Sequence, residues 1–450
     1  MTIYQFHKIK NHNISFSSNF PLGSGKCIHL SKKIIKVNPI KDPVTNKYTI
    51  GYDYYFNFYI KNHSNKKKNI LIYVLRDNLK KIKDWNSSNA PLFFSKNNLN
   101  WFLVKKVKSA NDNRDYKIDI TIKPNEKIFI SNNISLKPSF LKKKLMLIAN
   151  KNNKYIKYHE IGKSVDKRAI SAIEINFNKK KKNDRFLIWS GIHPSEPDVY
   201  STLSIIKWLI SDNKDAIEIR NNFIFDIIPV INPDGFQLGT NGCNKNGINI
   251  YWDFFGNTKE KCPESYYLWN FILKNPPQIA LDIHSYIYQT NKNSRPYIFP
   301  IKFYPVKLRY IAWKFQKSII KLNNNNALDG KTVYFKNTLG PTLIKKFGTL
   351  TLQGYHLHLA DGPKIFKKKS IDTIKFIHNS IKKFLPLHSK NIYYYKYDIN
   401  GILWIIFEKF FDRLPRKVTK YFIKNKERNP ISTSIKWKKY YNIKKEINLE

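Results

Sequence analysis

Residues 185–197 read Arg185-Phe186-Leu187-Ile188-Trp189-Ser190-Gly191-Ile192-His193-Pro194-Ser195-Glu196-Pro197. The stretch begins with a nearly continuous apolar run, which is typical of a strand buried on both faces of a parallel sheet. The run ends just before His193 and Glu196, and apolar residues then recur at helical spacing, at Val199, Leu203, Ile206 and Ile210. This order of strand, loop and helix predicts an α/β layer whose functional side chains gather at the carboxyl edge of the sheet.

The same alternation extends outward from this stretch. Further apolar runs of strand length alternate with segments whose apolar residues follow the helical period. Such alternation predicts an α/β fold with a mixed, largely parallel sheet flanked by helices. The expected strands are 171–177, 185–192, 223–231, 278–283 and 349–355, and the expected helices are 198–211, 263–273, 307–322 and 371–385.

The N-terminal third has a different pattern. Short aromatic and β-branched runs are separated by clusters of Asn, Asp, Lys and Pro, as in an antiparallel β-sandwich. These runs are 54–60, 69–74, 101–104, 116–122 and 127–130. We therefore expect an N-terminal β-sandwich domain over 1–155, the α/β domain over 156–390, and a basic, aromatic C-terminal extension over 391–450.

The chain carries a formal net charge of +48, yet its composition argues against a specific nucleic-acid partner. Only ten of the 80 basic residues are arginine, which is the residue best suited to bidentate contacts with phosphates and bases. Abundant Lys, Asn and Ile indicate a bias toward AT-rich codons. Nucleic-acid binding is thus a hypothesis that rests on charge alone. A positive field also favours acidic peptides or anionic surfaces.

The three cysteines, Cys27, Cys243 and Cys262, form no C-x-x-C pair and predict no disulfide framework. Residues 1–20 contain no apolar core of signal-peptide length, and no stretch reaches the roughly 18 apolar residues of a membrane span. Hydrophobic residues make up 42% of the chain, which is enough to form hydrophobic cores. We expect a cytoplasmic protein without a membrane span.

Three residues suited to binding zinc follow two of the expected strands. His193 and Glu196 follow the strand at 185–192, and His284 ends the strand at 278–283. Two histidines and one glutamate with an open fourth position are a catalytic zinc set, so the sequence predicts one Zn²⁺ ion. Asp282 is a candidate partner for orienting a ligand. A competing pair, His358 and Asp361, has no third ligand beside it.

Several motifs occur in an order that resembles the zinc carboxypeptidases of the funnelin group. They are His193-x-x-Glu196, then Asn232-Pro233-Asp234-Gly235-Phe236, then Asp282-Ile283-His284-Ser285-Tyr286, preceded by Ile161-Gly162-Lys163-Ser164 with Arg168. The β-rich N-terminal region with Gly239, Cys243 and Gly247 is most similar to the cytosolic carboxypeptidase branch. The resemblance implies hydrolysis of a peptide or amide bond by zinc-activated water. It also implies substrate contacts at Tyr251, Trp252 and Tyr286.

Three features depart from the family pattern, at four positions. Gly242 stands where relatives carry an arginine that polarises the scissile carbonyl. Tyr251 and Trp252 replace an Asn-Arg pair that grips a terminal carboxylate, and Gln353 replaces the glutamate that acts as general base. Losing general acid–base help costs about 10²- to 10⁴-fold, and losing an oxyanion donor costs on the order of 10²-fold or more.

Three readings of these departures therefore stay open, and one of them is that a residue other than Gln353 aligns with the general base of relatives. The chain is a zinc hydrolase, in which Lys245 can replace the arginine and Asp361 or His356 can replace the base. Alternatively it is a pseudoenzyme that keeps zinc and binds peptides without cleaving them. Tyr251 and Trp252 suit a pocket wall, and an aromatic wall favours apolar or sugar-like groups over a free carboxylate.

Overall fold

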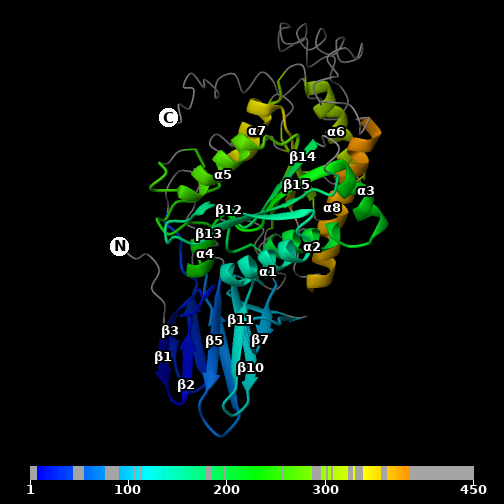
Figure 1. Ribbon diagram of the computed structural model, residues 1–450. Coiled ribbons are helices and arrows are strands. Elements are labelled where there is room, and N and C mark those ends of the chain that lie inside the picture. The colour runs from blue at the N-terminus through cyan, green and yellow to red at the C-terminus, as the bar shows by residue number, and fades with distance from the viewer. Residues whose placement is uncertain are drawn as a thin grey trace, which may run out of the picture.

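The computed structural model shows a β-rich unit joined to a larger α/β unit (Figure 1). The predicted extension at 391–450 lies outside the described residues. The residues described are 8–43, 55–76, 91–104, 107–111, 114–134, 136–178, 184–196, 198–252, 254–255, 258–285, 295–299, 303–305, 308–322, 328–329, 338–355 and 362–384.

The β-rich unit consists of two sheets. One sheet has six strands in the order β1-β2-β5-β11-β7-β8, and the other has five in the order β3-β4-β6-β10-β9. Their pairs are antiparallel except for β4 and β6, which run parallel. The bounds are β1 Lys8–Asn11, β2 Ile14–Ser17, β3 Lys26–Leu30, β4 Ile34–Asn38, β5 Asn57–Asn62, β6 Lys68–Val74, β7 Phe93–Ser95, β8 Phe102–Leu103, β9 Lys108–Ala110, β10 Asp115–Ile122 and β11 Lys127–Ser131.

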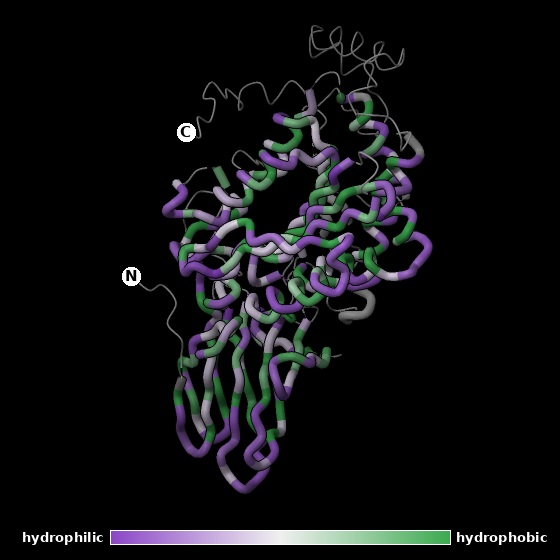
Figure 2. The backbone as a smooth tube through the Cα atoms, in the orientation of Figure 1, coloured by the Kyte–Doolittle hydropathy of each residue, from purple (hydrophilic) through white to green (hydrophobic). Residues whose placement is uncertain are grey.

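Alternating side chains build the core between these sheets. In β10, Tyr116, Ile118, Ile120 and Ile122 are buried, while residues between them face outward. The period of two places one face of each strand in the core. Figure 2 shows the resulting alternation of hydrophobic and hydrophilic residues along the strands of this unit. One apolar cluster joins residues of both sheets, so the sheets form a sandwich, as predicted from the sequence.

The α/β unit is built on an eight-stranded sheet in the order β12-β13-β15-β14-β16-β19-β17-β18. Its centre is parallel, since β14 lies between β15 and β16, and β16 pairs with β19. This confirms the predicted mixed, largely parallel sheet. The bounds are β12 Ile156–Lys163, β13 Ala169–Ile175, β14 Asp184–Trp189, β15 Phe223–Ile228, β16 Ile279–His284, β17 Arg295–Ile298, β18 Leu328–Asp329 and β19 Leu350–Tyr355.

Helices cover both sides of this sheet. Figure 1 shows α5 and α7 on one side and α2, α3 and α8 on the other. The central strands are consequently buried along their whole length, as in β16. The bounds are α1 Pro138–Lys151, α2 Asp198–Leu209, α3 Lys214–Asn222, α4 Pro233–Leu238, α5 Pro263–Lys274, α6 Arg309–Leu322, α7 Leu339–Phe347 and α8 Gly362–Phe384.

The predicted elements of the α/β unit are present, with shifted ends. The strand expected over 185–192 ends at Trp189, because Gly191 turns the chain with a positive φ of 64°. The sequence analysis did not predict α1, which lies within the segment expected to be β. Its buried residues Leu141, Leu145 and Ala149 have helical spacing, so the period was present in the sequence.

Candidate metal centre

The turn after β14 is set by Gly191. A Cβ added to Gly191 would lie 2.6 Å from the carbonyl oxygen of Pro229 and 2.7 Å from the Cα of Val230, and the positive φ also favours glycine. The Gly191 amide donates to the Asp198 carboxylate over 3.0 Å, and the Gly191 carbonyl accepts from the Asn232 amide over 3.0 Å. The loop that carries His193 and Glu196 is thus anchored at its first residue.

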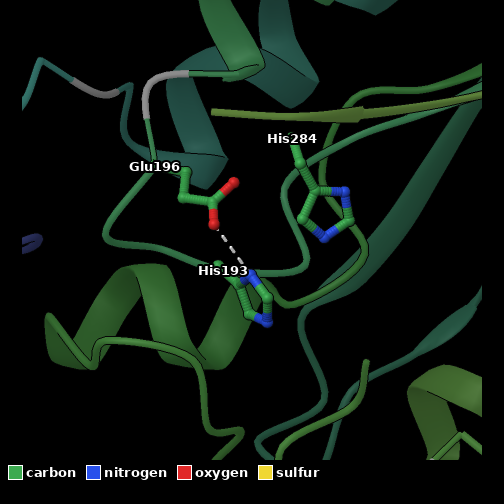
Figure 3. Close-up of side chains that lie close together, drawn as sticks. All are labelled: His193, Glu196 and His284. Atoms are coloured by element: carbon green, nitrogen blue, oxygen red, sulfur yellow. Dashed lines mark hydrogen bonds and ion pairs between the residues drawn. The ribbon is translucent and has the colours of Figure 1, made fainter. Parts of the chain in front are cut away.

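The structure brings His193, Glu196 and His284 together at the carboxyl ends of β14 and β16. Each residue offers one potential ligand atom, and these three atoms all lie within 4.8 Å of one another. The Glu196 carboxylate approaches His193 Nδ1 at 3.0 Å through Oε1, and its Oε2 accepts from the Ser285 amide at 2.6 Å. Figure 3 shows the three side chains turned toward a common space.

The donor set and its burial fit a zinc ion. Glu196 is 7% exposed and His284 is 3% exposed. The Nε2 atoms of His193 and His284 are buried, and neither has a hydrogen-bond partner. Buried polar atoms normally have partners, so these unpaired nitrogens suit a site that binds an ion or water. Two imidazoles and one carboxylate are the ligands that catalytic zinc takes.

Carboxylates surround His284 on several sides. Burial lowers the pKa of His284, but the nearby carboxylates of Asp282 and Glu196 raise it more, to about 9. The Asp282 Oδ1 lies 2.8 Å from His284 Nδ1. Burial also raises the pKa values of Asp282 and Asp198. The site therefore has an excess of negative charge that a divalent cation would offset, and Asp282 stands where a ligand-orienting carboxylate was expected.

The N-P-D-G segment links the loops of the site. Asn232 donates to the carbonyls of Ile192, over 3.2 Å, and Cys243, over 3.1 Å. Asp234 accepts from Ser164 at 2.7 Å and from Arg168 at 2.6 Å. The motif thus fastens the ligand loop to the segment at 240–243 on one side and to the strand connection at 164–168 on the other.

Asp42, from the β-rich unit, is a site-supporting residue that the sequence analysis missed. Its carboxylate, 2% exposed, accepts from the amides of Asn241 at 2.9 Å, Gly242 at 2.6 Å and Cys243 at 3.0 Å. A second hydrogen bond joins the loop to the β-rich unit, because the Asn241 side-chain oxygen accepts from the Tyr55 amide at 2.8 Å. No sequence pattern indicates this pairing, because about 200 residues separate Asp42 from the loop that it anchors.

Asp42→Asn is expected to destabilise the protein by about 2–3 kcal/mol, because hydrogen bonds to a charged acceptor contribute about 1.5–3 kcal/mol and buried amides would lose them. Chemical denaturation at neutral pH measures the change. The exposed Asp119 of β10 provides the control, and Asp119→Asn should stay within about 0.5 kcal/mol of wild type. Equal stability of Asp42→Asn and wild type would contradict the anchoring role.

Tyr251 and Trp252 form an aromatic wall beside the metal ligands. The Tyr251 ring centroid lies 4.7 Å from that of His284 and 5.6 Å from that of His193. Trp252 packs edge-on against Tyr251 at 5.0 Å. The backbone amides of both residues donate to Asn249 Oδ1, at 3.1 and 3.4 Å. A pocket wall formed by these two rings stays a prediction from the sequence.

The space beside Gly242 is closed by its neighbours. A Cβ at this position would lie 2.9 Å from Asn249 Nδ2 and 3.1 Å from His193 Cδ2. A larger side chain therefore requires one of these groups to move. Lys245, the alternative source of positive charge, forms an ion pair with Asp166 at 3.6 Å. In this structure its ammonium group is held by Asp166.

The other expected site residues are placed only in part. The backbone of Gln353 lies in β19, paired in parallel register with Asp282 of β16. The structure describes the backbone of Gln353 but not its side chain. Tyr286 lies outside the described residues, as do His356, His358 and Asp361. Their roles stay predictions from the sequence.

Glu264 is a buried carboxylate near the N-terminus of α5, in contact with Asn244 at 3.1 Å. Burial, together with the charge of Asp234, raises its pKa from 4.5 to about 7. The folded state therefore holds the proton more tightly than the unfolded state. This contribution to stability is present below pH 4.5 and is lost as the pH rises through about 7.

Glu264→Gln is expected to stabilise the protein at pH 8 by about 3 kcal/mol and to leave the stability at pH 4.5 nearly unchanged. Denaturant unfolding at the two pH values measures the difference. Glu260→Gln, at an exposed position before the same helix, should not reproduce the gain. If Glu264→Gln had the same pH dependence as wild type, Glu264 would not titrate in this range.

Residues 141–297 match the family model described as zinc carboxypeptidase. Cytosolic carboxypeptidase 3 of Mus musculus is 25% identical over 214 residues, which are 40% of this chain and 21% of that protein. Cytosolic carboxypeptidase 6 of Mus musculus is 27% identical over 150 residues, 31% of this chain and 28% of that protein. The chain thus matches between a fifth and about a quarter of the length of these relatives.

The fold is similar to that of solved bacterial metallocarboxypeptidases. The structure from Burkholderia cenocepacia superposes with a TM-score of 0.67 at 15% identity, over 82% of this chain and all of that chain. The structure from Pseudomonas aeruginosa gives 0.64 at 12% identity, over 82% of this chain and 99% of that chain. The coverage shows that the similarity includes much of the β-rich unit as well as the α/β unit.

Proposed function

We propose, from the match of residues 141–297 to the zinc carboxypeptidase family model, that the chain is a zinc-dependent hydrolase of peptide or amide bonds. The observation that carries the proposal is the convergence of His193, Glu196 and His284, with imidazole nitrogens that are buried and unpaired. His193, Glu196 and His284 would hold one Zn²⁺ ion. When bound, zinc lowers the pKa of a water ligand and polarises a carbonyl oxygen.

The protein's own groups would prepare this centre in three ways. The Ser285 amide orients the Glu196 carboxylate, and Asp282 orients the His284 ring. The loop at 240–243, held by Asp42, packs behind His193. The ring of Tyr251 packs against both imidazoles in T-shaped contacts. These contacts preorganise the ligands and lower the cost of assembling the site.

The rings of Tyr251 and Trp252 indicate which class of substrate the site would bind. Tyr251 and Trp252 present rings where relatives are expected to grip a carboxylate, so the pocket would accept an apolar or sugar-like group. The net charge of +48 supports acidic peptides as a further preference, through long-range attraction. No specific nucleic-acid partner is proposed.

The cytosolic names of the relatives support a cytoplasmic location. Among the described residues, none of the helices combines the length and apolar character that crossing a bilayer would require. We keep the division into a β-sandwich domain at 1–155, a zinc carboxypeptidase-like domain at 156–390 and an extension at 391–450. The two units have separate apolar clusters, and that of the α/β unit includes Leu141, Leu145 and Ala149 of α1, so α1 packs with the α/β unit although it precedes residue 156.

The second candidate function is a zinc-bound peptide-binding module without turnover. It is motivated by Gly242, which stands where relatives are expected to carry an arginine, and a side chain there would require Asn249 or His193 to move. A glutamine at position 353 also cannot shuttle a proton. Both candidates require the metal, and they differ in whether the bound peptide is cleaved.

Metal analysis combined with a peptide library separates the candidates. The hydrolase should contain about one zinc per chain and release C-terminal residues or amide products, and chelation should abolish this activity. Binding of peptides without cleavage, by a zinc-loaded protein, would favour the binding module. Cleavage that survives complete removal of the metal would overturn the proposed function.

A further inference from the structure

We propose a second binding site, a groove between α1, α2 and α8 that takes a small organic anion with an apolar body, such as a medium-chain carboxylate. The cavity has a volume of about 470 Å³. That size falls within the range of small-molecule sites. Nothing in the metal centre lines it, so this site is independent of the proposed hydrolase.

The groove has an apolar floor. The rings of Phe140 from α1 and of Tyr200 and Trp208 from α2 line it. Tyr200 also packs against a small apolar cluster built on Phe93 and Ile134 of the β-rich unit. The cavity therefore lies beside the seam between the two units, a common location for ligand sites. Phe140 is 42% exposed, so part of this apolar surface faces solvent.

The groove has a rim of three lysines, one from each helix. Lys144 lies on α1, Lys207 on α2 and Lys367 on α8, and all three line the cavity. Burial, and then the ammonium groups of Lys144 and Lys367, lower the pKa of Lys207. The charges of Lys144 and Lys367 thus lie close enough to Lys207 to repel its charge.

No carboxylate balances these charges. The lining of the cavity contains no Asp or Glu, and none of the three lysines forms an ion pair within the described part of the chain. Nearby lysines differ in this respect, since Lys142 pairs with Glu160 and Lys375 pairs with Asp215. An anion placed between the three lysines would relieve their repulsion.

The aromatic rings and the lysines of the groove together determine which kind of ligand it would bind. The rings would take up a hydrocarbon or aromatic body, and the burial of apolar surface favours binding. The ammonium groups of Lys144 and Lys367 lie 5.9 Å from the ring centroids of Phe140 and Tyr200, so the charges stand at the edge of the apolar floor. A ligand with one anionic head and an apolar tail matches this arrangement.

The proposal is tested by calorimetric titration of the zinc-loaded full chain with decanoate, below the concentration at which decanoate forms micelles. Decanoate should bind with saturation at one site, and the uncharged analogue decanol should bind more weakly. The double variant Lys207→Ala with Lys367→Ala should weaken decanoate binding by about 3- to 10-fold, as expected for two solvent-accessible charge pairs. Rising salt should weaken binding in wild type.

Two further variants make the result decisive. Ser204→Trp fills the cavity from α2 and should abolish binding while it leaves the lysines in place. Lys143→Ala removes an exposed lysine of α1 outside the groove and should bind decanoate as wild type does. Absence of decanoate binding, equal affinity for decanol, or unchanged binding by Ser204→Trp would each overturn the proposal. Circular dichroism and zinc content establish that each variant is folded.

Discussion

His284→Ala is expected to remove zinc from the protein and, with it, any hydrolysis of peptide substrates. His284 supplies one of three candidate ligand groups and approaches the other two from a separate strand. Loss of an orienting partner of a ligand already costs roughly 10- to 100-fold in metal affinity, and loss of the ligand itself should cost more. Zinc measured after dialysis should fall from about one ion per chain to near zero.

A second histidine provides the control for this experiment. His159 of β12 lies in the same sheet but outside the metal centre, where its ring faces Phe271 with the centroids 6.2 Å apart. His159→Ala should therefore retain zinc and activity. Full retention of zinc by His284→Ala would show that the three residues do not form the metal site, and both proposed functions would then fail.

Gln353→Glu is expected to raise the rate of peptide hydrolysis by about 10²- to 10⁴-fold, the usual contribution of a positioned general base. The backbone of Gln353 pairs with Asp282, two residues before His284, so the position lies on the strand next to the metal ligand. A carboxylate can take a proton from a reacting water, and a glutamine amide cannot. Single-turnover rates of both proteins, at equal zinc content, measure the gain.

Two companion variants test whether the gain comes from proton transfer at the metal. Gln353→Met preserves approximate size without a proton acceptor and should give no increase. The double variant with His284→Ala should be inactive, because the base has no activated water to act on. A zinc-loaded Gln353→Glu protein that shows no faster turnover would mean that another group already acts as the base, or that the loss of the arginine at position 242 limits the reaction.

Much of the fold could be predicted because burial of one face of a helix or strand makes apolar residues recur at a regular spacing along the sequence. The apolar run of β14 and the helical spacing of α2 predicted the α/β layer, and the period of two in β10 predicted the sandwich. Helix α1 was missed because it follows a β-rich region and carries few start signals beyond Pro138. Strand ends were also misplaced where one residue, such as Gly191, turns the chain.

The sequence by itself also determined which residue types can serve the site. His193 and Glu196 follow one strand and His284 ends another, and parallel neighbours deliver their carboxyl ends to a common edge. Local order and strand direction were therefore sufficient to predict that these three would meet.

Only the tertiary structure decided the surroundings of the site. The anchoring of the loop at 240–243 by Asp42, the closed space beside Gly242 and the lysine-rimmed groove join segments that are distant in the chain. Such contacts follow from how sheets and helices pack, and packing depends on the shapes of many side chains at once. No local period or motif encodes them, which is why they appear only once the chain is folded.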